Sequence, residues 1–188
     1  GKLTAAAGYT AGPGISIGSG SSSGLVQGNW IGLNSAASIV SNAGAGIDIS
    51  GASGWIIGGT NSGARNIIGG NGSEGIYSFA GDNLVIQGNT IGVDGGGFAK
   101  PNLSGISIQS GTNVLIGGNT AGARNYLSGN AQVGLIVQNG RDIRIQGNHI
   151  GPSPTGGYAS NVSYGIRIIG GANVTVGGTN FNEGNVIS

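Results

Sequence analysis

The stretch GIDISGASGWIIGGTNSGARNIIGGN, residues 46–71, decides the fold, because its parts return at regular distances along the 188-residue chain. Its opening pattern is a glycine, an apolar residue, any residue and a second apolar residue. This pattern occurs six times, and the copy at Gly75, which reads GIYS, matches it only in part. The copies begin at Gly14, Gly46, Gly75, Gly105, Gly134 and Gly165. Their spacing of 29 to 32 residues predicts six coils of one repeating structure.

A longer period joins these coils in pairs. The sequence Gln-Gly-Asn-x-Ile-Gly stands at residues 27–32, 87–92 and 146–151. A second motif, [I/V]-G-G-[T/N], stands at residues 57–60, 116–119 and 176–179. Both motifs return at offsets of 59 and 60 residues, which defines three double-coil repeats.

One asparagine per coil stands two positions before an aliphatic residue that is followed by Gly or Ser, and it is the most regular feature of the chain. The six residues are Asn29, Asn66, Asn89, Asn125, Asn148 and Asn185. Successive members are separated alternately by 36 or 37 and by 23 residues, so even coils carry an insertion before the asparagine and odd coils carry a loop after it. The insertions are residues 60–65, 119–124 and 179–184, and the loops are approximately 33–45, 93–104 and 152–164.

The local patterns favour strands. Segments such as GIDI and NIIGG are too short and too rich in glycine for helices, and Ile at alternate positions, as in GIDI, is a strand signal. Three short strands per coil predict an all-β, right-handed, three-sided parallel β-helix of about six coils. We assign residues 14–188 to a single β-helix domain of three double-coil repeats, and residues 1–13 to an N-terminal partial coil or cap.

The repeated asparagine has a structural explanation. Asparagine tolerates the left-handed backbone conformation that a tight corner needs, and its amide can bond to the same residue in the coils above and below. We therefore interpret the six asparagines as a structural ladder rather than as a ligand site.

The motif GIxI…IGGT…ARNxISGN…GIxI…IQGNxIG covers nearly all of residues 14–188 and resembles the right-handed parallel β-helix repeats of large bacterial surface and secreted proteins. The resemblance implies a stalk, an adhesin or a passive scaffold without assigned chemistry. The odd-coil loop departs from that family's pattern: Asp94 and Asn102 fit it, whereas the fifth coil has Pro152-Ser153-Pro154. A function shared by all of these loops is therefore not expected.

Composition limits the partners. Charged residues make up 7% of the chain and the net charge is +1, so no basic surface for nucleic acid is expected. The sequence contains no run of 18 apolar residues, so membrane insertion is not expected. The absence of Cys and Met is compatible with an extracellular or cell-surface location. The opening GKLTAAAG lacks the apolar stretch of a signal peptide, so we read the chain as a mature or excised segment.

Polysaccharide lyases and hydrolases share this fold class, but their chemistry needs clustered carboxylates for calcium or for acid–base work. The acidic residues here are Asp48, Glu74, Asp82, Asp94, Asp142 and Glu183. No two of them occupy the same repeat position in adjacent coils, and VDGGG at 93–97 lacks the nonapeptide repeat of β-helix calcium sites. We therefore expect no catalytic residue, no cofactor and no metal.

A row of outward side chains follows the ladder asparagines. Trp30, Tyr126 and His149 belong to it, and their rings can stack on one another or against a sugar. Arg65 and Arg124 precede ladder asparagines in even coils, where we expect them to bond loop carbonyls.

A second outward row is aliphatic. Leu25, Ile56, Val85 and Leu115 follow one another on the second strand of successive coils, and form a stripe of exposed side chains. Three explanations stay open: lateral association with a partner, a covering segment from residues 1–13, or a misread register.

Four Asn-x-Ser/Thr sequons, at Asn71, Asn102, Asn161 and Asn173, fall near predicted turns where a glycan can be accommodated, but in a chain this rich in Asn, Ser and Thr chance explains most of them. The chain also stops inside a motif, since residues 185–188 match 125–128. Either it is a piece of a longer array, or copies stack head to tail.

Three functions follow from these observations. The first is an extracellular structural or adhesive module that self-associates, head to tail into fibres or laterally. The second is a carbohydrate-binding or polysaccharide-degrading β-helix, whose groove would be built by the odd-coil loops with Asp94, Lys100 or Tyr158 near it. The third is ice binding, although no outward Thr-x-Thr row exists.

Overall fold

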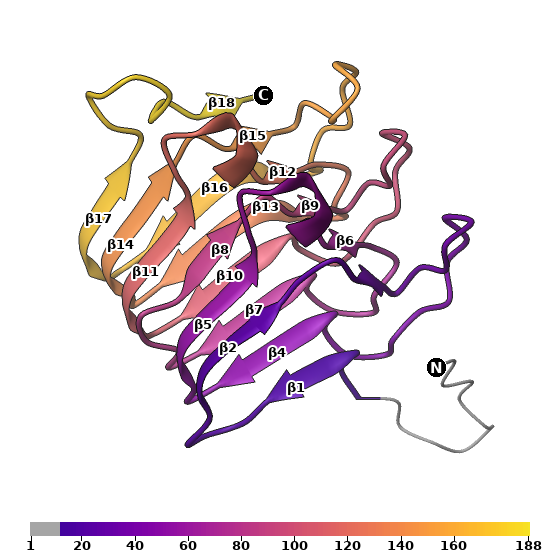
Figure 1. Ribbon diagram of the computed structural model, residues 1–188. Helices are drawn as coiled ribbons and strands as arrows, with labels where there is room; N and C mark the ends of the chain where they lie inside the picture. Colours follow the sequence, from indigo (N-terminus) through magenta and orange to yellow (C-terminus); the bar gives the residue numbers. More distant parts are fainter. Residues whose placement is uncertain (1–11) are drawn as a thin grey trace.

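The computed structural model describes residues 12–188 as an all-β solenoid with three parallel six-stranded sheets (Figure 1). Consecutive strands enter the first, second and third sheet in turn, so one strand of each sheet makes up one coil, and we number the coils 1 to 6 along the chain. The predicted three-sided parallel β-helix is thereby confirmed. The predicted N-terminal segment, residues 1–13, lies outside the described residues except for its last two positions.

The strands are short, as the glycine-rich sequence requires. The first sheet contains β1 (Ile15–Ile17), β4 (Ile47–Ser50), β7 (Ile76–Phe79), β10 (Ile106–Gln109), β13 (Val133–Gln138) and β16 (Tyr164–Ile169). The second contains β2 (Ser22–Val26), β5 (Ser53–Gly58), β8 (Val85–Gln87), β11 (Thr112–Gly117), β14 (Arg141–Gln146) and β17 (Ala172–Val176). The third contains β3 (Trp30–Ile31), β6 (Ile67–Ile68), β9 (Thr90–Ile91), β12 (Tyr126–Leu127), β15 (His149–Ile150) and β18 (Val186–Ile187).

The pairing register is the one that the sequence repeat predicts. In the first sheet, for example, Asp48 pairs with Ser16 on one side and with Tyr77 on the other. Side chains alternate along a strand, so each row of paired residues points either into the solenoid or out of it. Ile47 and Ile49 point inward and are buried, whereas Asp48 between them points outward and is partly exposed.

The core is a stack of inward rows built from Ile, Val and Leu, and the side chains in the middle coils are fully buried. Two positions depart from this pattern. Ser78 replaces the aliphatic residue between Ile49 and Ile108, and its buried hydroxyl has no hydrogen-bond partner. Trp55 lies inward beside Gly24, where a Cβ atom would come within 2.4 Å of the indole ring.

The insertions and loops flank the third sheet. The odd-coil loops follow β3, β9 and β15 and project to the same side of the solenoid (Figure 1). Each begins as a small hairpin closed by one antiparallel bridge, as between Val93 and Ala99. Two of the even-coil insertions contain a single 3-10 turn, η1 (Ser62–Ala64) and η2 (Ala121–Ala123).

The corner before the third sheet differs from the expectation. The left-handed residue there is a glycine, not the ladder asparagine: Gly28, Gly88 and Gly147 have φ of 69°, 67° and 66°, and no ladder asparagine has a positive φ. In the even coils Arg65 and Arg124 precede the asparagine in extended conformation. The reason is steric, because only glycine adopts the left-handed conformation without cost to a side chain.

Candidate functional site

The six repeated asparagines are joined into one continuous ladder. Each Nδ2 atom from Asn29 to Asn148 donates to Oδ1 of the next asparagine, over 2.9 to 3.1 Å. The same Nδ2 atoms also donate to backbone carbonyls; that of Asn89, for instance, reaches the carbonyl of Ile57 at 2.9 Å. The amides are therefore occupied by the fold and are not available to a ligand.

A second asparagine ladder, which the sequence interpretation missed, follows the corner after the third sheet. Its members are Asn42, Asn71, Asn102, Asn130 and Asn161, and each Nδ2 donates to the next Oδ1 over 2.8 to 3.2 Å. The sequence did contain a signal, because these residues are spaced by 28 to 31 positions. Their flanking sequences vary more than those of the first ladder, which hid the pattern.

The second ladder contradicts the expectation that three of the sequons have room for a glycan. Asn71 and Asn102 are buried, and Asn161 is partly buried, with each side-chain amide nitrogen engaged in hydrogen bonds. A glycan is attached to that nitrogen, so glycosylation would break the ladder. Only Asn173 lies on the surface, where its Nδ2 donates to Asp142 at 2.8 Å.

The outward row on the third sheet exists but is not one continuous aromatic surface. Tyr126 and His149 pack edge to face, with ring centroids 5.4 Å apart. Trp30 belongs to the same row, but Ile67 and Thr90 separate it from Tyr126. Trp30 and the Tyr126–His149 pair therefore do not form one continuous aromatic surface, although they stand in the same row.

The two arginines beside this row behave differently. The Nε of Arg124 donates to the carbonyl of Gly147 at 3.2 Å, as expected. Arg65 instead donates to Oγ1 of Thr90 at 2.9 Å, and its guanidinium lies over the ring of Tyr126 at 5.4 Å. Burial lowers the pKa of Arg65, and the Coulombic interaction with Tyr126 partly offsets this shift. The side chain nevertheless stays charged at neutral pH, because guanidinium is so strongly basic.

The aliphatic stripe is a true row of the second sheet, because Leu25, Ile56, Val85 and Leu115 are paired in this order. A misread register is thereby excluded. The row is less exposed than expected: Leu25 is open to solvent, but the other three are only partly exposed. A side chain in a middle coil is covered on both sides by its neighbours in the row, which explains the difference.

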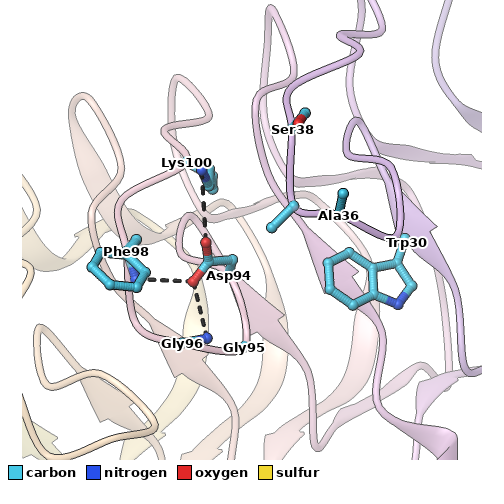
Figure 2. Close-up of a pocket in the computed structure, with 9 residues that line it drawn as sticks. Trp30, Ala36, Ser38, Asp94, Gly95, Gly96, Phe98 and Lys100 are labelled. Carbon is cyan, nitrogen blue, oxygen red and sulfur yellow. Dashed lines mark hydrogen bonds and ion pairs between the residues drawn. The ribbon is translucent and has the colours of Figure 1, made fainter.

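A pocket of about 580 Å³ opens beside Trp30, between the odd-coil loops of coils 1 and 3 (Figure 2). Trp30 lines one side together with Ala36, Ala37 and Ser38. Asp94, Gly95, Gly96, Phe98 and Lys100 line the other side. The predicted carbohydrate groove was expected to have Asp94, Lys100 or Tyr158 near it. Asp94 and Lys100 line the same pocket as Trp30, whereas Tyr158 does not line it.

The polar groups of the pocket are organised around Asp94. Its Oδ1 accepts hydrogen bonds from the backbone N–H groups of Gly96 at 2.9 Å and of Phe98 at 3.0 Å, and its Oδ2 lies 3.6 Å from Nζ of Lys100 (Figure 2). The carboxylate of Asp94 thus stabilises the turn of the loop in which it lies. No group of three or more potential metal ligands occurs within residues 12–188.

Comparisons of this chain with protein-family models, with curated proteins and with solved structures gave no match. Among the described residues, no helix is long and apolar enough to span a membrane.

Proposed function

We propose that this chain is an extracellular structural module whose coils stack head to tail, so that the open face of coil 6 takes a further coil of the same kind. The proposal agrees with the resemblance of the repeats to those of bacterial surface and secreted β-helix proteins. Its main support is one observation: the contact between adjacent coils repeats the same buried apolar rows and the same asparagine hydrogen bonds along the described residues.

The inward side chains of coil 6 belong to rows that are fully buried in the middle coils. Ile168, Val176 and Ile187 are 44%, 45% and 49% exposed, although their row partners Val137, Ile145 and Ile150 are fully buried. The strands β16, β17 and β18 also stand at the edge of their sheets, with a partner on one side only.

This face has the chemistry of the contact between adjacent coils. It combines apolar rows with strand edges and with Asn185, the last member of the first ladder. An unpaired parallel edge is a template for another strand, and a solenoid grows by nearest-neighbour contacts. A further coil of the same kind is therefore the occupant that best fits the face.

The test is the association state of the chain, measured by light scattering over a dilution series and by electron microscopy. We expect concentration-dependent assembly, with a rise of about 29 Å for six coils at about 4.8 Å each. Val176→Lys places a charge on the open face and should abolish assembly. Thr175→Lys changes the neighbouring outward residue of β17 and should leave assembly intact.

A wild-type chain that stays monomeric at all concentrations would overturn the proposal, as would equal effects of the two lysine variants. Circular dichroism of both variants checks that each one folds. The enzyme alternative has its own test: turnover of an acidic polysaccharide that disappears with one carboxylate would favour it.

A further inference from the structure

A repeat protein contains its own internal controls, since each position of coil 3 has an equivalent in coils 1 and 5. The three odd-coil loops share the same backbone hydrogen bonds: the N–H groups of Val40, Lys100 and Ala159 donate to Gly32, Gly92 and Gly151, respectively. Differences between equivalent side chains are therefore not required by the backbone of the loop.

Those differences gather in the pocket beside Trp30. Where coil 3 has Asp94 and Lys100, coil 1 has Asn34 and Val40. Asn34 Oδ1 accepts the same two turn hydrogen bonds, each of 3.0 Å, as Asp94 Oδ1 does. A neutral side chain is thus sufficient to close the turn, and neither the charge of Asp94 nor its lysine partner is explained by the loop.

The gap between loops also differs along the solenoid. The loops of coils 3 and 5 touch, because Oγ1 of Thr155 donates to the carbonyl of Gly96 at 3.3 Å. Gly97 faces Ser153 and Thr155 so closely that a Cβ atom there would lie 2.7 Å from the Thr155 hydroxyl. The loops of coils 1 and 3 instead leave the pocket open, with the half-exposed Trp30 beside it.

The open pocket combines an aromatic face with a neutralised pair of polar groups. Trp30 is 41% exposed and Phe98 is 71% exposed. Asp94 and Lys100 cancel in net charge, yet the ammonium retains protons to donate and the carboxylate retains lone pairs to accept. Such a pair suits adjacent hydroxyl groups, one accepting from Lys100 and the other donating to Asp94, and offers no net attraction to an acidic ligand.

We propose that the pocket between the odd-coil loops of coils 1 and 3 binds a neutral sugar unit of a glycan. One ring face lies on the indole of Trp30, and adjacent hydroxyls bond to Asp94 and Lys100. The volume of about 580 Å³ lies within the range of small-molecule sites, about 300 to 1,000 Å³. This inference does not depend on assembly through coil 6, since the pocket lies in coils 1 to 3.

The test is calorimetric titration of the purified chain with neutral hexose oligosaccharides, compared with uronic acid oligosaccharides of equal length. Trp30→Thr introduces the residue that coil 3 has at this position. The double variant Asp94→Asn/Lys100→Val rebuilds the pair of coil 1 and keeps the turn closed. We expect a neutral oligosaccharide to bind, and each of these variants to weaken binding at least tenfold.

Phe181→Ala is the matched control, because this aromatic side chain is exposed outside the pocket. It should leave the affinity unchanged, and circular dichroism confirms folding of every variant. The inference is overturned if no neutral oligosaccharide binds, if uronic acid oligosaccharides bind as tightly, or if Phe181→Ala weakens binding as much as Trp30→Thr.

Discussion

Ile108 in coil 4 and Ile168 in coil 6 occupy the same inward row of the first sheet, yet the first is fully buried and the second is half exposed. Both residues have the same local sequence pattern and the same strand conformation. The difference therefore comes only from what is stacked above them. In a solenoid a coil does not bury its own core, and burial is a property of the contact between neighbouring coils.

The largest test of this comparison uses the first asparagine ladder. Asn89→Ala removes amide bonds to both neighbouring asparagines and to the carbonyl of Ile57 in a fully buried position. We expect a loss of about 4 kcal/mol, because buried partners lose their hydrogen bonds at about 1 to 3 kcal/mol each. Chemical denaturation followed by circular dichroism measures this free energy of unfolding.

Asn185→Ala is the matched variant in coil 6, where the side chain is only partly buried and has one ladder neighbour. Its expected cost is about 1 kcal/mol. Equal costs at Asn89 and Asn185 would show that the ladder acts within a coil and not between coils.

A smaller effect is expected in the core. Ile108→Ala should destabilise the protein by about 3 kcal/mol, because it leaves a cavity between two covered coils. Ile168→Ala removes the same atoms from a half-exposed side chain, and should cost about 1 kcal/mol. The same denaturation experiment applies. If Ile168→Ala proves as costly as Ile108→Ala, the open face must already be covered in solution.

Within the covered coils, Ser78 is the side chain that fits its row least well. Ser78→Ala removes a buried hydroxyl without a hydrogen-bond partner, and we expect it to stabilise the protein by about 1 kcal/mol. Ser128→Ala is the control of opposite sign, since that hydroxyl donates to the carbonyl of Pro152 at 2.8 Å. A loss of stability in both variants would mean that the Ser78 hydroxyl has a partner in solution.

The smallest effect concerns His149 in coil 5, which has one further coil above it. Burial lowers the pKa of His149, and the nearby Arg124 lowers it further. The unfolded chain then binds the proton more readily, so stability is lost as the pH falls through the unfolded pKa of about 6.5. We expect a slight fall in Tm below that pH, and His149→Gln should remove it. Parallel pH profiles for the two proteins would refute this.

The sequence predicted the coils, the outward rows and the first ladder because the repeat places equivalent residues one coil apart, and parallel pairing preserves that order. It wrongly assigned the left-handed corner to the asparagine, because Gly28 and Asn29 are both suitable for a turn. The partly buried members of the aliphatic row, such as Val85, were misjudged for a similar reason. Exposure depends on the rows above and below.

The pocket lay at the limit of prediction. Trp30 was placed in an outward row, and Asp94 and Lys100 on an odd-coil loop, but nothing in the repeat showed that these would meet. Whether they line one pocket depends on the distance between two loops. The loops of coils 3 and 5 are in contact, whereas those of coils 1 and 3 leave a pocket between them. A contact of this kind involves residues that break the repeat, so the repeat carries no information about it.

The fit of Trp55 against Gly24 has a consequence for how the chain finds its order. Nearly identical coils invite pairing one repeat out of place, because the asparagine ladders and apolar rows would still match. Trp55 does not tolerate such an error, because a Cβ atom on the coil below would collide with its indole ring, and Gly24 is the residue that offers the space. The fit between Trp55 and Gly24 thus identifies coils 1 and 2 as neighbours.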